Sequence, residues 1–454
     1  MVDVQFIREN PERMRSIINS GRGNPEKANI DLWLKLDKER TLLVQQRDAL
    51  NTKKNELANL GKSGATSDDI RKKGQELKQE SQKIEESLTR IEKEWQEILA
   101  WMPNIPHQDM PEGKGEDDNL IIRAWDPANG YVENFNEVRV KDSVNPFPAR
   151  SMHWDKEDLK AKHHLEIGEA LELIDNNQGA KVSGSRFTYI VGDLALMQYA
   201  IQQLLFSKLL SMGFKQIIPP LLVREVALFG TSHFPEQVDQ VYKIDNTYLE
   251  DSSKPLYLVG SSEPSNFSYF IDKTLSAETL PIKLFAYTSC FRSEAGSWGR
   301  DTKGIKRLHQ FDKIEMNVVC NPEESDKIFD ELLSVNEWLL QELRLPYHLV
   351  LKCTGDAGYM ASSKQIDPEV WLPGQKEFME VMTDTNTTDY QARRLNIKFK
   401  DETGAKKYVH TVNDTGVAMG RMLIAIIDNY QQADGTIKVP EALRKFMGKD
   451  YIGK

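Results

Sequence analysis

Cysteine is scarce in this chain of 454 residues, which contains only Cys290, Cys320 and Cys353. The three lie far apart and form no CxxC pair, so neither a disulfide framework nor a cysteine zinc cluster is expected. We expect them to be buried as small hydrophobic side chains. So few cysteines also favour a reducing compartment, and we expect a cytoplasmic protein without zinc.

Long apolar runs are also absent, which predicts no transmembrane helix and no membrane partner. The start, MVDVQFIRENPERMRS, lacks the apolar stretch of a secretory signal. No GxGxxG, GxxxxGKS or GxxxxGKT occurs, so neither a Rossmann nor a P-loop site is indicated. The eight histidines form no HExxH or triad-like pattern. The net charge of −10 neither indicates nor excludes RNA binding, because an acidic protein can bind RNA through a local basic surface.

The most informative stretch, residues 284–319, reads as two strands around a glycine-containing loop. Side chains two residues apart share a strand face. That alternation would gather five side chains on one surface: Arg292, Glu294, Phe311, Lys313 and Glu315. Arginine binds phosphate oxygens and an aromatic ring stacks on a base, so this pattern favours a nucleotide site. The alternative is an ordinary amphipathic hairpin with surface salt bridges.

The segment CFRSEAGSWGRDTKGIKRLHQFDKIE resembles motif 2 of the class II aminoacyl-tRNA synthetases, in the form found in seryl-tRNA synthetases. The resemblance extends over essentially the whole chain. It implies an α+β fold, with a class II antiparallel sheet flanked by helices and an N-terminal antiparallel coiled-coil arm. It also implies a homodimer that activates L-serine with ATP and Mg²⁺ and transfers it to tRNA(Ser).

Two segments, 31–60 and 68–102, have strong helix character and apolar residues every seven positions. The repeats are Leu36, Leu43, Leu50 and Leu57, then Ile70, Leu77, Ile84, Ile91 and Ile98. A short glycine-containing turn joins them, and Thr66 or Ser67 can cap the second helix. We therefore predict an antiparallel coiled-coil hairpin with helices about 50 Å long. Leu88 and Trp95 fill the seam near the base better than Gly74 and Ser81 fill it near the tip.

Basic residues gather around the predicted tip, with few acids among them: Lys53, Lys54, Lys62, Arg71, Lys72 and Lys73. Such a cluster can hold a phosphate backbone. A solvated coiled-coil surface is the alternative. In the family that this chain resembles, the arm grips the long variable arm of the tRNA, which implies a tRNA-binding role for the cluster.

Three domains are expected: an N-terminal tRNA-binding domain at 1–102, a linker at 103–120 and a catalytic domain at 121–454. Proline marks the linker, because it fixes φ and removes a hydrogen-bond donor. In the last domain, residues 193–214 read as a helix that leads into KQIIPPLLV, and residues 323–343 read as another. The first of these units resembles motif 1, which builds the dimer interface; a buried helix and an edge strand is the alternative.

Four further strips resemble the family's active site, and one of them is TDYQARR, which follows the family pattern. In LYLVGSSEPSN, Ser261 and Glu263 would share a strand face, and Ser261 departs from the family's threonine. After DPEVWLPGQKEF, relatives commonly have Glu followed by two serines. Here Glu380 is kept, whereas Met382 and Thr383 replace the serines. The last strip, VNDTGVAMGR, resembles motif 3, a strand followed by a helix with Arg421 at the junction.

The resemblance assigns roles to these positions. ATP is expected to contact Arg292, Ser293, Glu294, Leu308, Phe311, Glu380, Val381, Met382, Thr383 and Arg421. Serine is expected to contact Ser261, Ser262, Glu263, Arg292, Glu315, Asn413 and Thr415. Arg292 and Arg421 are the expected catalytic residues, and Glu380 with Thr383 would bind Mg²⁺, which prefers oxygen ligands. Asp414 is unusual within the serine-recognition turn.

Two alternatives to a seryl-tRNA synthetase remain at this point. One is a synthetase-like paralogue that charges an acceptor other than tRNA, although such an acceptor would not need the arm. The other is a non-catalytic RNA-binding or scaffolding protein, which the departures at Ser261, Met382 and Thr383 keep open. If Met382 faces ATP, Met382→Ser should improve ATP binding; if it points into the core, the same change should only destabilise the fold.

Overall fold

The computed structural model describes residues 1–62, 68–132, 138–143, 147–156, 159–248, 251–296 and 304–453. The chain divides into two compact units, Met1–Pro103 and Asn104–Lys454, and each is described by itself. Within the described ranges no helix is long and apolar enough to cross a bilayer. The three cysteines are free and buried, as predicted.

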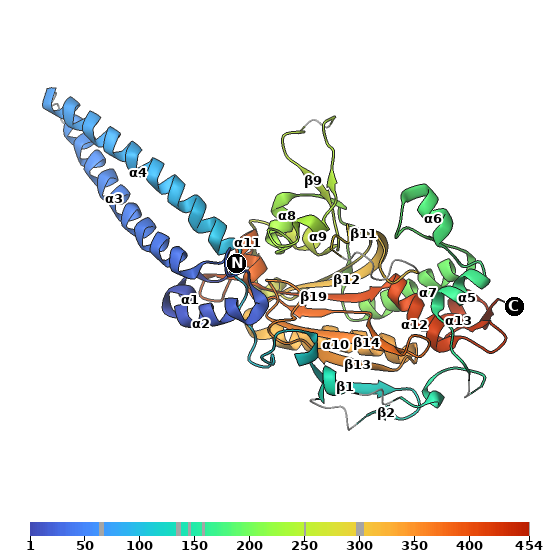
Figure 1. Ribbon diagram of the computed structural model, residues 1–454. Coiled ribbons are helices and arrows are strands. Elements are labelled where there is room, and N and C mark those ends of the chain that lie inside the picture. The colour runs from blue at the N-terminus through green and yellow to red at the C-terminus, as the bar shows by residue number, and fades with distance from the viewer. Residues whose placement is uncertain are drawn as a thin grey trace. The chain divides into compact units, whose positions relative to one another are not determined.

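Two long helices dominate the first unit and run side by side (Figure 1). Its helices are α1 (Val4–Glu9), α2 (Pro11–Ile17), the π-helical turn Ile18–Arg22, α3 (Ile30–Lys62) and α4 (Asp68–Ala100). Leu36, Leu50 and Ile91 on the predicted stripes are buried, whereas Leu57 and Leu77 nearer the tip are only half-buried. The heptad pattern therefore predicted both helices and their better-packed base. The capping positions Thr66 and Ser67 lie outside the described residues.

Aromatic and charged side chains tie the two helices together at the base of this arm. Trp33 and Trp95 stack with ring centroids 5.5 Å apart. The Asp37 carboxylate accepts hydrogen bonds from the Arg8 guanidinium at 2.8 and 2.9 Å and from the Trp95 indole at 3.1 Å. Arg40 lies over the Trp95 ring, 5.1 Å from its centroid. These contacts fix the root of the arm independently of its tip.

The second unit is built on an eleven-stranded sheet in the order β2-β1-β13-β14-β16-β19-β12-β11-β6, with β15 beside β14 and β3 beside β1. The strands are β1 (Leu120–Asp126), β2 (Gly130–Tyr131), β3 (Val138–Arg139), β6 (Lys215–Gln216), β11 (Ile282–Phe291), β12 (Gln310–Cys320), β13 (Tyr347–Leu351), β14 (Lys364–Leu372), β15 (Glu377–Glu380), β16 (Asp384–Asn386) and β19 (His410–Ala418). Every pair in this sheet is antiparallel except β11 with β6. The predicted α+β class and antiparallel sheet are confirmed.

Helices flank this sheet and share its main hydrophobic core, to which α7, α10 and α12 contribute most of the helical side chains (Figure 1). The helices are α5 (His164–Ala170), α6 (Asn176–Ser183), α7 (Gly192–Ser211), α8 (Glu225–Gly230), α9 (Glu263–Ser268), α10 (Ser325–Glu342), α11 (Tyr390–Leu395), α12 (Met419–Tyr430) and α13 (Glu441–Met447). The predicted helices at 193–214 and 323–343 correspond to α7 and α10. Gly213 follows α7 with φ of +81°, a conformation that glycine adopts without strain.

Four small sheets complete the second unit. They pair β4 (Ile174–Asp175) with β5 (Tyr189–Ile190); β7 (Leu222–Arg224) and β8 (Lys243–Ile244) with β9 (Leu256–Leu258); β10 (Thr274–Ser276) with β17 (Lys398–Lys400) and β18 (Lys406–Tyr408); and β20 (Ile437–Lys438) with β21 (Tyr451–Ile452). The segment expected as a linker is held by this unit. Asn104 is buried there and its side-chain amide donates to the carbonyls of Ala361 and Thr387 at 2.8 and 2.9 Å.

Candidate active site

A cavity of about 640 Å³ opens in the second unit where β11, β12, β15, β19 and α12 meet the segment before α9. The five side chains predicted to share one surface of the hairpin all line it: Arg292, Glu294, Phe311, Lys313 and Glu315. The same cavity is lined by Ser261, Glu263, Leu308, Glu380, Val381, Thr383, Asn413, Thr415 and Arg421. Strips that are far apart in the sequence therefore converge on one space.

At one end of the cavity, Arg292 lies over the ring of Phe311, with its guanidinium carbon 5.4 Å from the ring centroid. Its Nε donates to the Gly260 carbonyl at 3.2 Å, which orients the guanidinium. Glu294 receives a hydrogen bond from Arg307 at 3.0 Å. Strand alternation does not place Glu294, because β11 ends at Phe291 and Glu294 has φ of +52°; that part of the prediction was wrong. The predicted loop residues 297–303 lie outside the described residues.

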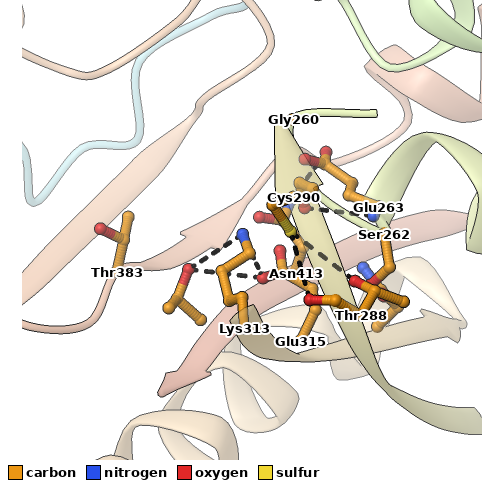
Figure 2. A network of polar contacts seen from close by, with 12 residues as sticks. Gly260, Ser262, Glu263, Thr288, Cys290, Lys313, Glu315, Thr383 and Asn413 are labelled. Atoms are coloured by element: carbon orange, nitrogen blue, oxygen red, sulfur yellow. Dashed lines mark hydrogen bonds and ion pairs between the residues drawn. The ribbon is translucent and has the colours of Figure 1, made fainter. Parts of the chain in front are cut away.

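A buried ion pair occupies the next part of the cavity. Lys313 and Glu315 are 5 % and 2 % exposed, and the Lys313 ammonium lies 2.5 Å from Glu315 Oε2. Lys313 and Glu315 are labelled in Figure 2, and the Thr415 hydroxyl lies 3.4 Å from both of them. Since Glu315 faces Thr415 across the β12–β19 pair, the register of the sheet itself brings this hydroxyl to the carboxylate.

Glu263 forms a second acidic centre in the cavity. It does not share a strand face with Ser261, as the alternation predicted, because β9 ends at Leu258 and Glu263 begins α9. The Ser261 hydroxyl instead accepts a hydrogen bond from the Glu263 amide at 3.2 Å. Burial, together with the nearby charge of Glu315, raises the pKa of Glu263 to about 7. This carboxylate can therefore change its charge near neutral pH.

Glu380 and Arg421 form an ion pair at the opposite wall. Arg421 Nη1 lies 2.7 Å from Glu380 Oε1 and 3.0 Å from the Glu380 carbonyl, and the Thr383 hydroxyl lies 3.3 Å from the same carboxylate oxygen. Burial would raise the pKa of Glu380, but the positive charges of Arg421 and Lys352 outweigh it and hold the pKa below its ordinary value. As predicted, Arg421 lies in the first turn of α12, directly after β19.

Three residues assigned to ligands do not line the cavity. Met382 is fully buried in the main core, so its side chain does not face the cavity, and its contact with ATP stays a prediction. The Ser262 hydroxyl accepts from the Asn266 amide at 3.3 Å, and the Ser293 hydroxyl donates to the Asp239 carbonyl. Neither serine lines the cavity, and the ligand contacts predicted for them stay predictions.

Several further cavity residues were missed from the sequence, and three of them, His233, Tyr359 and Gln365, carry polar side chains. Burial, with the charges of Arg292 and Lys313, lowers the pKa of His233 to about 3, so its ring is neutral at physiological pH. None of the three belongs to a pattern with a period or a motif spacing. Only the fold brings them to the cavity.

Possible oxygen ligands for a metal ion lie beside the Glu380–Arg421 ion pair. Glu380 and Thr383 supply hard oxygen atoms beside a cavity that could hold phosphates, which suits Mg²⁺ bound together with a nucleotide. Across the described ranges no group of three or more His, Cys, Asp or Glu side chains could hold a metal ion. The residues therefore fit an ion that arrives with its own phosphate ligands better than a metal held by protein alone.

The predicted basic cluster lies on the parts of α3 and α4 that are nearest the turn. Lys53, Arg71, Lys72 and Lys73 are exposed and Lys54 is half-buried. Among the described side chains these five form no ion pair. The Lys62 side chain lies outside the described part of the chain. The surface formed by these side chains is available to a polyanion.

The antiparallel sheet, the long β11–β12 hairpin with Arg292 and Phe311, and Arg421 at a strand-to-helix junction define the core of a class II aminoacyl-tRNA synthetase. The family model of the tRNA synthetase class II core domain (G, H, P, S and T) matches residues 242–430, and that of the seryl-tRNA synthetase N-terminal domain matches residues 1–106. The chain belongs to the seryl-tRNA synthetase family.

Relatives in this family match the chain over its whole length. The serine–tRNA ligase of Pyrococcus horikoshii is 37 % identical over 99 % of this chain and 96 % of its own, and that of Thermodesulfovibrio yellowstonii is 36 % identical over 100 % of both. The crystal structure of the Pyrococcus horikoshii enzyme complexed with ATP superposes with a TM-score of 0.86 at 35 % identity and covers 100 % of this chain and 99 % of that one. The Naegleria fowleri cytoplasmic enzyme in complex with AMP gives 0.81 at 27 % identity, covering 100 % and 98 %.

Proposed function

We propose that this protein is a serine–tRNA ligase that activates L-serine with ATP to seryl-adenylate and transfers the seryl group to tRNA(Ser). One observation carries the proposal. A single cavity combines a guanidinium stacked on an aromatic ring, Arg292 on Phe311, with the acidic and hydroxyl groups of Glu263, Glu315 and Thr415. The first pair suits a nucleotide and the second set suits a small amino acid with a polar side chain.

The chemistry requires that two anions meet. The serine carboxylate attacks the α-phosphorus of ATP and pyrophosphate leaves; in the second step a ribose hydroxyl at the tRNA 3′ end attacks the carbonyl carbon and AMP leaves. Arg292 and Arg421 would offset the negative charge that accumulates in the first step, and no protein nucleophile is needed. Mg²⁺ bound with ATP would screen the phosphates, and Glu380 and Thr383 would hold it.

Serine would be recognised by polar groups at the other end of the cavity. Glu315 and Thr415 can both bond to the substrate hydroxyl, and Glu263 is another acid of the same cavity, with no ion pair to a described residue. A site that binds a hydroxyl group rejects a substrate that lacks it far better than an apolar pocket rejects a missing methylene. Alanine and glycine are therefore expected to be poor substrates.

The basic cluster on α3 and α4 would hold the tRNA backbone, through the residues Lys53, Lys54, Lys62, Arg71, Lys72 and Lys73. Residues 1–102 would thus form the tRNA-binding domain, 103–120 the connection and 121–454 the catalytic domain. A homodimer in the cytoplasm completes the proposal. The homodimer is supported by a group of exposed apolar side chains on α7 and the following motif 1 segment: Leu196, Tyr199, Leu210, Ile218 and Leu222.

Amino-acid-dependent exchange of pyrophosphate into ATP tests the activation step. Serine should support exchange, whereas threonine, alanine and glycine should not at comparable concentrations. Arg292→Ala should abolish serine-dependent exchange and leave the circular dichroism spectrum unchanged, since the side chain lines the cavity rather than the core. Arg150→Ala, at an exposed arginine outside the cavity, is the control. Exchange by Arg292→Ala within a few-fold of the parent would overturn the assignment of this site.

A further inference from the structure

Two side chains without an assigned role, Tyr359 and Gln391, converge on one oxygen of Glu263. The Tyr359 hydroxyl donates to Glu263 Oε1 at 2.9 Å, and the Gln391 amide donates to the same atom at 2.6 Å. The Asn413 amide adds a longer contact at 3.3 Å and also donates to the Tyr359 hydroxyl at 3.1 Å. Glu263 and Asn413 both line the cavity, and Figure 2 shows both side chains within the network of polar contacts.

A further layer of hydrogen bonds fixes these donors. The side-chain oxygen of Gln391, Oε1, accepts a hydrogen bond from the Thr411 hydroxyl at 2.9 Å. This bond orients the side-chain amide so that its nitrogen faces Glu263. Gln391 is fully buried on α11, and Thr411 lies on β19. These hydrogen bonds connect helix α11 with the central strand β19. The donors to Glu263 therefore have little freedom to turn away.

All three donors to Glu263 are neutral, which separates this carboxylate from the other acids of the cavity. The charge of Glu315 is balanced by Lys313 at 2.5 Å, and that of Glu380 by Arg421 at 2.7 Å. Glu263 forms no such ion pair with any described residue, and its Oε2 accepts no hydrogen bond from them. Its negative charge thus remains available to a cationic ligand.

We propose that Tyr359 and Gln391 are positioning residues that hold Oε1 of Glu263, so that Oε2 receives the ammonium group of the amino-acid substrate. The inference rests on the proposed function, because the ammonium belongs to the serine that is activated. Neutral donors suit the role, since they stabilise a carboxylate without cancelling the charge that attracts the substrate.

The environment of Glu263 makes the role measurable through pH. Burial and the charge of Glu315 raise its pKa to about 7, whereas Gln391, Tyr359 and the ammonium of Lys313 act in the opposite direction. Arg292, His233 and Glu236 also line the cavity. The His233 ring is neutral, and Glu236 accepts a hydrogen bond from the Met360 amide, next to Tyr359, at 3.3 Å. Removal of a donor should raise the pKa of Glu263 further, because the carboxylate loses stabilisation relative to the acid.

The test compares Tyr359→Phe with the parent in serine-dependent pyrophosphate exchange between pH 6 and 9. We expect the KM for serine to rise about 10- to 100-fold, the range for loss of a hydrogen bond to a charged group. The KM for ATP should stay within about two-fold, because Tyr359 and Gln391 hold the acid that binds the amino acid and not a residue assigned to ATP. The pH below which kcat/KM for serine falls should move upward. Gln391→Met should act in the same direction.

Tyr347→Phe is the matched control, because the Tyr347 hydroxyl also donates to a buried carboxylate, Glu337, at 2.8 Å but lies outside the cavity. It should lower the melting temperature without changing the KM for serine or the pH profile. If the parent is active with serine but Tyr359→Phe behaves like this control, the inference about Tyr359 and Gln391 fails while the proposed function stands. A parent that shows no serine-dependent exchange would overturn the proposed function and this inference together.

Discussion

At the scale of single residues, the departures from the family pattern prove to have different structural meanings. Thr383 keeps a hydroxyl beside Glu380 and lines the cavity, so it can replace a serine there. Met382 faces the opposite side and packs in the core. Strand alternation could not decide whether Met382 or Thr383 faces the ligand, because β15 ends at Glu380 and residues 381–383 belong to no strand. The sequence therefore predicted the strip but not its register.

Met382→Ser should consequently destabilise the fold without improving ATP binding. The change removes a buried apolar side chain and introduces a hydroxyl among the apolar neighbours of the core, which costs about 2–5 kcal/mol of unfolding free energy. The melting temperature and the KM for ATP, measured on the same preparation, decide the point. A lower KM for ATP would restore the interpretation that this residue faces the nucleotide.

Asp414, which is unusual in the serine-recognition turn, faces away from the cavity and pairs across the sheet with Asp384. Both carboxylates are fully buried. Asn336 of α10 donates to Asp414 at 2.7 Å, whereas both oxygens of Asp384 are buried without a side-chain partner in the described structure. Burial raises the pKa of each well above its ordinary value. Repulsion from Asp414 and Asp330 adds to the effect at Asp384, and repulsion from Glu315 adds to it at Asp414.

This pair makes the protein less stable as the pH rises. A carboxyl group with a raised pKa in the folded state binds more protons there than in the unfolded chain, so stability falls from the unfolded pKa near 4 up to the folded value. Asp384→Asn should therefore increase the free energy of unfolding at pH 8 by about 1–3 kcal/mol and flatten its pH dependence. Urea unfolding at pH 6 and pH 8 checks this, with the exposed Asp117→Asn as control. Equal loss of stability at both pH values would contradict it.

At the scale of secondary-structure elements, periodic segments were predictable and short ones were not. The heptads of α3 and α4 and the apolar spacing of α7 and α10 depend on many residues, so local pattern predicts them well. The turn before α9 depends on contacts with distant parts of the chain, as does the placement of Asn104 against residues 361 and 387. The motif-bearing strips of the cavity were predictable because their chemistry is specific. Gln391 lies in TDYQARR, a strip that follows the family pattern, but the pattern assigned it no role, and Tyr359 belongs to no such strip.

The arm should be separable from serine activation. Removal of residues 46–85, with a short turn joining Gln45 to Glu86, keeps the base contacts of Trp33, Asp37 and Arg40 and removes the basic cluster. Serine-dependent exchange should stay within about two-fold of the parent, whereas kcat/KM for tRNA charging should fall by about 10³-fold or more, because several phosphate contacts disappear.

Charge reversal provides the matched variant for this truncation. Changing Lys53, Arg71 and Lys72 to glutamate retains the helices, since these side chains are exposed and form no ion pair with described residues. It should reduce charging strongly and make the remaining charging less sensitive to salt. Charging at the parent's efficiency by either variant would show that the arm does not bind the tRNA.

At the scale of the whole molecule, exposed apolar side chains on the second unit indicate a subunit interface. Ile218 is 89 % exposed, and Tyr199 and Leu210 on α7 are 55 % and 56 % exposed. Large exposed apolar side chains that gather on adjacent elements mark interaction surfaces in soluble proteins. The same α7 segment packs its other face into the core beside β19 and α12, so an interface formed on α7 would also stiffen the strand that carries Asn413 and Thr415.

Because of this exposed apolar surface, we expect the protein to sediment as a homodimer with twice the chain mass of 52.0 kDa. Ile218→Asp should shift it toward the monomer, because burying an unpaired carboxylate in an apolar interface costs several kcal/mol. Serine-dependent exchange should fall in parallel with the dimer fraction. Tyr248→Asp, at a side chain that is 97 % exposed between β8 and β9, should leave both unchanged. Sedimentation velocity across a concentration series distinguishes the cases: a parent that remains monomeric at micromolar concentration while fully active would show that this face has another partner or none.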